Sequence, residues 1–167
     1  MKSLTFATLL LLALGAPAHA DYDAGVTAYK KGDYRVAMRE FRALAAKGVV
    51  LAYTNVAYMY ALGEGVKADL GEAATWFRKA AEAGSAAAQL TLGVLYYNGE
   101  GVKRDYPRAY AWFNIAATNG RDDALRYMGV VMQRMDKTQS VAAQKLSREL
   151  YDRYASTSAA AAAPGRP

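Results

Sequence analysis

Apolar residues along this chain recur at intervals of three and four positions, which is the spacing of an amphipathic helix. Residues 86–98 carry Leu92, Leu95 and Tyr96 at this spacing, and residues 105–119 carry a second stripe. A short polar segment, Gly-Glu-Gly-Val-Lys-Arg, separates the two. The pattern therefore predicts two helices joined by a turn. The second stripe comprises Tyr106, Ala109, Tyr110, Phe113, Ala116 and Ala117.

The same pattern occurs twice, 36 residues apart. A shift of this length superimposes Gly-Glu-Gly-Val-Lys at 63–67 on the copy at 99–103, and the Trp-Phe pair at 76–77 on the pair at 112–113. The unit also runs into a further copy beyond residue 120. Repetition of a two-helix unit at a fixed period indicates a helical solenoid, in which each unit packs on its neighbours.

Signals for the ends of helices fall at the expected places in each unit. Asp69 and Asp105 precede the second helices, where a carboxylate can cap the first turn. Gly84 and Gly120 follow them, where a left-handed residue is favoured. Gly93 lies inside a predicted helix, at a cost of roughly 1 kcal/mol relative to alanine. We expect Gly93 to allow close approach of the partner helix.

The two ends of the chain carry variants of the unit. Phe41 lies in register with the Phe of the later pairs, and the turn before it is reduced to Gly32. The last unit keeps a first helix, roughly residues 122–135, but its second helix, roughly 139–154, lacks the Trp-Phe pair. Terminal repeats often deviate because one face meets water. The prediction is about four helix pairs, in units 22–47, 48–83, 84–119 and 120–155, with a disordered tail at 156–167.

The second full unit resembles the Sel-one-like repeat family, a relative of the tetratricopeptide repeat. The resemblance rests on Gly84, Ala88, Leu92, Gly93, Tyr96, Gly99, Gly101, Val102, Asp105, Ala109, Trp112, Phe113 and Ala116. It implies an all-α fold, a right-handed solenoid of antiparallel helix pairs. It also implies a non-enzymatic scaffold or adaptor that binds a protein or peptide partner.

In such a superhelix the first helix of each pair lines the concave face. The register set by Gly93 predicts a groove that is aromatic and apolar in the middle and basic towards its ends. This surface suits an acidic peptide or a C-terminal carboxylate. The alternative for each tyrosine is a place in the core. The predicted groove residues are Tyr22, Val26, Tyr29, Lys30, Thr54, Tyr58, Ala61, Leu62, Leu90, Val94, Tyr97, Asn98, Arg126, Val130, Gln133 and Arg134.

The first twenty residues have the three parts of a secretory signal peptide. Lys2 supplies the positive start, an apolar run follows, and Ala18-His19-Ala20 is a small-x-small cleavage site. The sequence therefore predicts cleavage after Ala20 and a periplasmic or secreted monomer without stable membrane insertion. The alternative is an uncleaved N-terminal anchor, although the apolar run is shorter than the ~20 residues of a membrane span.

The residue types present restrict the chemistry. The chain contains no cysteine, and its one histidine, His19, lies in the predicted signal peptide. Serine–histidine and cysteine–histidine catalysis, zinc sites of the usual kind and thiol redox chemistry are therefore excluded for the processed chain. We expect no cofactor, no metal and no catalytic residue.

The formal net charge is +6, and its excess is concentrated near the N-terminus. Arg35, Arg39 and Arg42 lie at i, i+4 and i+7, so they share one face of a helix. This basic face is either simply solvated or binds an anionic envelope polymer or surface. No nucleic-acid-binding motif accompanies the charge, so we expect no nucleic-acid partner.

The repeated Gly-Glu-Gly-Val-Lys segment also has chemical interpretations. Residues 63–68 match the dinucleotide fingerprint G-x-G-x-x-A, but the second copy has Arg104 at the last position, and a helix rather than a strand precedes both. A hydrolase that uses Glu64 and Glu100 as paired carboxylates is a second alternative. Because a solenoid repeats its turns rather than its chemistry, we interpret the segment as a turn between helices.

Overall fold

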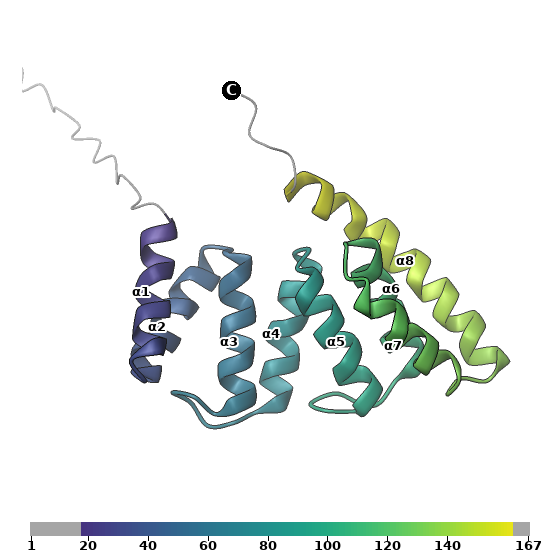
Figure 1. Cartoon of the computed structure of the whole chain (residues 1–167), viewed down its shortest axis with the longest axis horizontal. Coiled ribbons are helices and arrows are strands. Elements are labelled where there is room, and N and C mark those ends of the chain that lie inside the picture. The colour runs from purple at the N-terminus through teal and green to yellow at the C-terminus, as the bar shows by residue number, and fades with distance from the viewer. Residues whose placement is uncertain (1–17, 162–167) are drawn as a thin grey trace, which may run out of the picture.

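The computed structural model describes residues 18–161, with side chains from 22 to 154, and this part of the chain is folded into eight helices without a strand. Figure 1 shows the helices following one another along the long axis of the molecule in chain order. The prediction of an α-solenoid of helix pairs is confirmed. The helices are α1 (Ala18–Lys30), α2 (Tyr34–Ala46), α3 (Val50–Leu62), α4 (Leu70–Glu82), α5 (Ala86–Asn98), α6 (Tyr106–Thr118), α7 (Asp123–Met132) and α8 (Lys137–Ala161).

Aspartate side chains at the predicted positions cap the starts of α4 and α6. The Asp69 carboxylate accepts hydrogen bonds from the backbone N–H groups of Gly71 and Glu72 at 2.9 and 3.0 Å. The Asp105 carboxylate accepts one from Arg108 N–H at 2.9 Å. These bonds satisfy backbone donors that have no partner within the helix. The aspartate caps predicted from the repeat are therefore confirmed.

The core consists of two apolar clusters that meet between α3 and α4. One surrounds Phe41 and joins α1, α2 and α3, and the other surrounds Phe77 and Phe113 and extends to α8. Tyr53 and Trp76 pack against both clusters, with ring centroids 6.0 Å apart. Burial of the same aromatic position in successive units makes the solenoid continuous.

Each Gly-Glu-Gly-Val-Lys turn joins the two helices of one unit and contacts the unit before it. Gly65 and Gly101 have φ values of +73° and +68°, which a residue with a side chain rarely adopts. A Cβ atom on Gly65 would collide with the Tyr34 carbonyl, and one on Gly101 would collide with the Leu70 carbonyl. Each turn therefore lies directly on the start of the second helix of the preceding unit. The interpretation of the segment as a turn is correct.

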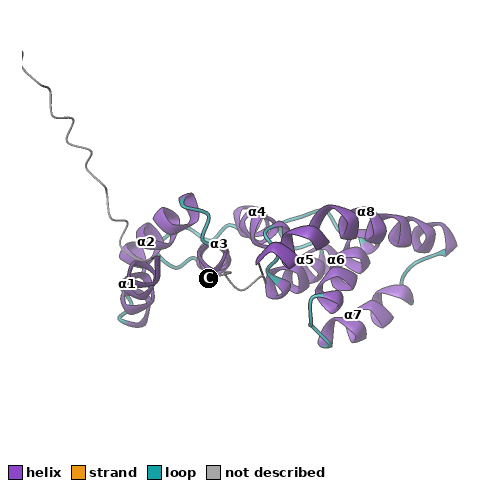
Figure 2. Ribbon diagram, turned by 90° about the horizontal axis from the view of Figure 1, so that it is seen from above, coloured by secondary structure: helices purple, strands orange, loops and turns teal. Residues whose placement is uncertain are grey.

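The C-terminal unit differs from the predicted helix pair because α8 packs along α6 rather than along α7. Figure 2 shows α7 and α8 on different sides of α6. The helix bounds differ as well, since α7 ends at Met132 and α8 starts at Lys137. The prediction of a disordered tail from residue 156 also differs, because α8 continues to Ala161 through an alanine-rich segment of high helix propensity.

The remaining predictions on the termini fall mainly on residues that the structure does not describe. Most of the expected signal peptide lies in residues 1–17, and the end of the expected tail lies in residues 162–167, both outside the described part. Within residues 18–161, no helix combines the length and the hydropathy that crossing a bilayer requires.

Candidate functional site

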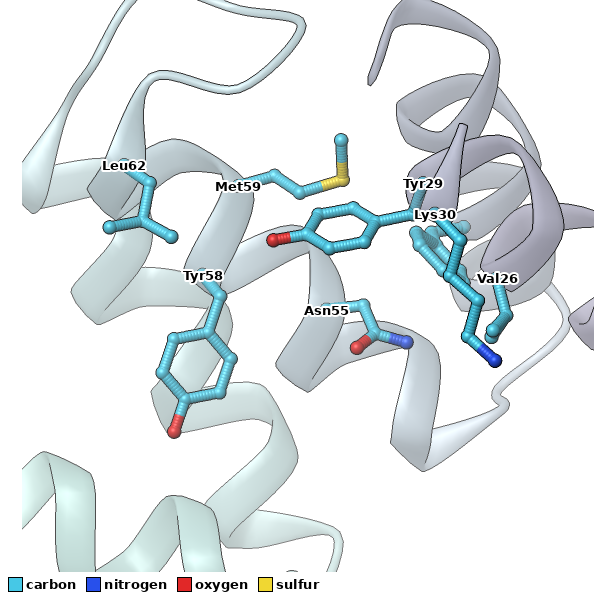
Figure 3. A pocket seen from close by; sticks show the side chains of 8 residues that line it. Val26, Tyr29, Lys30, Asn55, Tyr58, Met59 and Leu62 are labelled. Atoms are coloured by element: carbon cyan, nitrogen blue, oxygen red, sulfur yellow. The ribbon is translucent and has the colours of Figure 1, made fainter. Parts of the chain in front are cut away.

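A cavity of about 380 Å³ lies between α1 and α3. Its wall is almost entirely apolar or aromatic, which is typical of a site that binds another molecule. Figure 3 shows Tyr29 and Lys30 projecting from α1 and Asn55, Tyr58, Met59 and Leu62 projecting from α3. The lining residues are Val26, Tyr29, Lys30, Phe41, Asn55, Tyr58, Met59 and Leu62.

Helical spacing builds this wall from two helices. Asn55, Tyr58 and Leu62 fall at i, i+3 and i+7 of α3, so one face of that helix carries all three. Val26 and Tyr29 stand one turn apart on α1. Phe41 of α2 and Met59 of α3 are buried, so they form the floor while the other residues remain accessible.

Aromatic contacts hold the two exposed tyrosines in place. Tyr58 packs edge-on against Phe77, with ring centroids 4.9 Å apart. Tyr29 packs edge-on against Tyr34 at 5.3 Å. Because each ring is held by a neighbour, less conformational entropy is lost when a ligand covers it.

The polar groups around the cavity connect the walls to each other. The Asn55 side chain donates a hydrogen bond from Nδ2 to the Tyr22 hydroxyl at 2.8 Å, which joins α3 to α1. The Tyr29 hydroxyl donates a hydrogen bond to the Glu64 carboxylate, and this bond, together with burial, raises the pKa of Tyr29 above its usual value. Lys30 supplies a positive charge at the exposed edge.

Five residues of the predicted groove line this cavity. Tyr29, Lys30 and Tyr58 line it, as do Val26 and Leu62. Two further predicted residues, Tyr22 and Thr54, do not line the cavity. The Tyr22 ring packs against Phe41, with ring centroids 5.7 Å apart, and the Thr54 hydroxyl is buried without a hydrogen-bond partner.

Sequence reasoning missed three lining residues, Phe41, Asn55 and Met59. Asn55 precedes Tyr58 by three positions, so the helical spacing of α3 contained a signal for it. Phe41 was assigned only to the repeat pattern, and nothing in that pattern indicated that its ring would form the floor of a cavity.

The predicted groove residues of α5 and α7 do not line this cavity. Leu90, Val94 and Tyr97 are partly buried against the core, and the Asn98 side chain donates a hydrogen bond to Glu100 at 3.0 Å. In the last unit, Arg126 and Arg134 are exposed, at the opposite end of the solenoid from α1. The cavity is thus confined to the first two units.

Arg35, Arg39 and Arg42 are all exposed on α2, as the helical spacing predicts. Arg39 forms an ion pair with Glu40, with its Nη2 atom 2.7 Å from Oε1. This neighbouring carboxylate offsets part of the positive charge of the face, so the structure adds no observation that favours an anionic ligand there.

Glu64 and Glu100 occupy equivalent turns but have different surroundings. Glu64 is partly buried and its carboxylate meets Tyr29, whereas Glu100 is exposed and accepts a hydrogen bond from Asn98. Among the residues whose side chains the structure describes, no three acidic or histidine side chains converge to hold a metal ion. The arrangement around α1 and α3 has the mainly apolar wall and few polar groups that are typical of a ligand-binding site.

The comparisons with known proteins agree with the repeat. The family model described as Sel1 repeat matches residues 50–85 and 86–120. Among solved structures, the chain is similar to a protective antigen present in uropathogenic Escherichia coli strains that displays an SLR fold, with 33% identity and a TM-score of 0.77. That similarity covers 90% of this chain and 34% of the antigen.

A Sel1 repeat protein from Oxalobacter formigenes is also similar, with 29% identity, a TM-score of 0.63, and coverage of 68% of this chain and 49% of that protein. The chain thus spans between about a third and a half of the length of these two proteins. A search of curated proteins gave no match.

Proposed function

Because this chain is a Sel1-repeat protein, we propose that it is a non-enzymatic scaffold that holds a segment of a partner protein in the cavity between α1 and α3. Scaffolds of this fold typically mediate protein–protein interactions. The observation that carries the proposal is the apolar cavity itself, whose open side is lined by Tyr29, Tyr58 and Leu62. Exposed aromatic and aliphatic side chains around a concave site are typical of energetically important contacts in interfaces.

The chemistry of the wall defines the ligand. The floor of Phe41 and Met59 suits an apolar side chain, and Lys30 at the edge suits a carboxylate next to it. We therefore propose that the bound segment presents a large apolar residue followed by an acidic residue or a C-terminus. Asn55 supplies a polar group on the same wall.

A matched pair of substitutions on one helix tests this site. Leu62 lines the cavity and is 63% exposed, whereas Leu51, also on α3, is 61% exposed and lies outside it. A photo-crosslinking residue at position 62 should capture a discrete partner in cells, and the same residue at position 51 should not. Lys30→Glu should reduce capture at position 62 by about tenfold, since a charge at an interface is replaced by its opposite.

Circular dichroism should show unchanged folding for all three variants, because the altered side chains are exposed. Equal capture at positions 51 and 62, or capture that does not respond to Lys30→Glu, would show that the cavity is not the binding site.

We also propose that the protein is exported and that cleavage follows Ala20. This proposal is supported by the charged start, the apolar run and the Ala18-His19-Ala20 site. Cleavage there would shorten α1 by three residues at its start, while Tyr22 and the rest of the helix remain. Intact-mass spectrometry of the protein from the periplasm or the medium should give a chain that begins at Asp21. A full-length chain in the membrane fraction would instead support the uncleaved anchor.

A further inference from the structure

One helix interface is made repeatedly within this chain. In the first unit, a Cβ atom on Gly25 would lie 2.7 Å from the Phe41 ring, and in the third unit a Cβ on Gly93 would lie 2.5 Å from the Phe113 ring. The ring of the second helix therefore lies directly on the backbone of the first. The absence of a side chain at this position is what allows the two helices to approach so closely.

Helix α7, the first helix of the last unit, has a glycine at the equivalent position, but no aromatic ring of the described chain lies on it. Gly129 lies 36 residues after Gly93, and a Cβ atom on it would meet nothing within 4 Å. One turn to either side, Leu125 is 58% exposed and Met132 is 50% exposed. The corresponding residues in α5, Gln89 and Tyr96, are buried. We call the face formed by Leu125, Gly129 and Met132 the α7 stripe.

The sequence of α8 explains why the described part of the chain does not cover this stripe itself. In the repeat register, the Ala109, Phe113 and Ala116 positions of α6 correspond to Lys145, Glu149 and Asp152 of α8, all exposed. Charged side chains at these positions would be desolvated against the stripe at a large cost. The apolar face of α8, which includes Leu146 and Leu150, packs on α6 instead.

The stripe is held in a fixed position by the rest of the fold. On the adjacent face of α7, Ala124 and Val131 are buried and Met128 packs against the core. On the side of α7 away from the stripe, Tyr127 stacks on Phe113 with ring centroids 5.1 Å apart. The apolar surface is therefore formed before any partner binds, so little entropy is lost on docking.

We propose that the α7 stripe is a docking site for an amphipathic helix of a partner protein that carries a phenylalanine with alanines one turn before and after it. The occupant is defined by continuity with an interface that the chain already makes, since Phe113 of α6 lies on Gly93 of α5, with the buried Ala109 and Ala116 one turn to either side of it. The phenyl ring of the partner lies on Gly129, and the flanking alanines allow the two helices to approach closely. This site is separate from the cavity between α1 and α3 and does not depend on it.

The probe for this proposal is a peptide of the chain's own α6 segment, residues 104–120, labelled with a fluorophore and titrated with the full chain. Anisotropy should show saturable binding. Binding should be about tenfold weaker for the peptide with Phe113→Ala and for the protein with Gly129→Glu, because either change removes the contact between ring and backbone. Circular dichroism should show that Gly129→Glu folds, since the position is open.

Two control variants make the result specific to the stripe. Val141→Glu introduces the same charge on α8 at a residue that is 61% exposed, and it should leave peptide binding unchanged. Lys30→Glu, at the cavity, should also leave it unchanged, so the failure of one proposed site can be distinguished from the failure of the other.

Absence of saturable binding up to about 1 mM peptide, or binding that is insensitive to Gly129→Glu, would overturn the proposal. Light scattering tests whether a second copy of the chain, rather than a partner helix, covers the stripe. If the chain forms dimers that Gly129→Glu converts to monomers, a second copy covers the stripe and the proposal of a partner helix is wrong.

Discussion

At the scale of single residues, Gly93 and Gly129 occupy the same place in successive units but have different surroundings. The Phe113 ring covers Gly93, while Gly129 faces open space. Gly93→Ala should lower the free energy of unfolding by about 1–3 kcal/mol, because a new methyl group must displace a buried ring. Gly129→Ala should raise it by about 0.5–1 kcal/mol, the difference between glycine and alanine inside a helix. Urea denaturation followed by circular dichroism measures both, and changes of the same sign would contradict this account.

Tyr29 and Glu64 provide a test that depends on pH. The pKa of Tyr29 is raised because its neutral hydroxyl donates to the Glu64 carboxylate, which would repel a phenolate. The stabilisation is therefore complete below the ordinary tyrosine pKa of about 10 and is lost as the pH rises through the higher value in the folded state. NMR titration should show Tyr29 ionising at lower pH in Glu64→Gln than in the unmodified chain.

The repeat supplies the control for this titration. Glu100→Gln changes the equivalent residue of the next unit, which is exposed and bonded to Asn98. This substitution should leave the pKa of Tyr29 unchanged. A downward shift of the Tyr29 pKa in both variants would indicate a general charge effect rather than the specific hydrogen bond.

At the scale of elements, a turn within one unit also contacts the preceding unit. Gly101 combines a positive φ with backbone contact to Leu70, whereas Gly48 has a positive φ of +83° and nothing within 4 Å of a Cβ. Gly48→Ala should cost about 1–2 kcal/mol, the penalty for a left-handed residue with a side chain. Gly101→Ala should cost more, because the turn must also move away from α4. Chemical denaturation of the two variants gives the difference, and equal costs would show that the contact with α4 is unimportant.

At the scale of the whole molecule, stability is expected to vary along the solenoid. The interface between α2 and α3 is the least extensive of those between successive units, and the cavity separates α1 from α3. Units of a repeat protein are stabilised mainly by their neighbours. Hydrogen exchange measured by mass spectrometry should therefore show faster exchange for amides of α1 and α2 than for those of α5 and α6. Uniform protection along the chain would instead indicate a single cooperative unit.

The sequence by itself determined the helices, the pairing of α1 to α6, and the aspartate caps of α4 and α6. The spacing of apolar residues, the aspartates at positions 69 and 105 and the glycines at 84 and 120 act within a few residues of their own positions. Such local signals predict the helices of one unit correctly, and the 36-residue period places the same helices in the next unit. The groove face of α1 and part of that of α3 followed from the same register.

Only the tertiary structure decided which of the equivalent positions form a site. Glu64 meets Tyr29 while Glu100 does not, although the Gly-Glu-Gly-Val-Lys segment is identical in the two turns. Gly129 is uncovered while Gly93 is buried, because α8 packs on α6 rather than returning along α7. These differences depend on contacts between residues far apart in the chain, where packing selects among positions that local sequence makes alike.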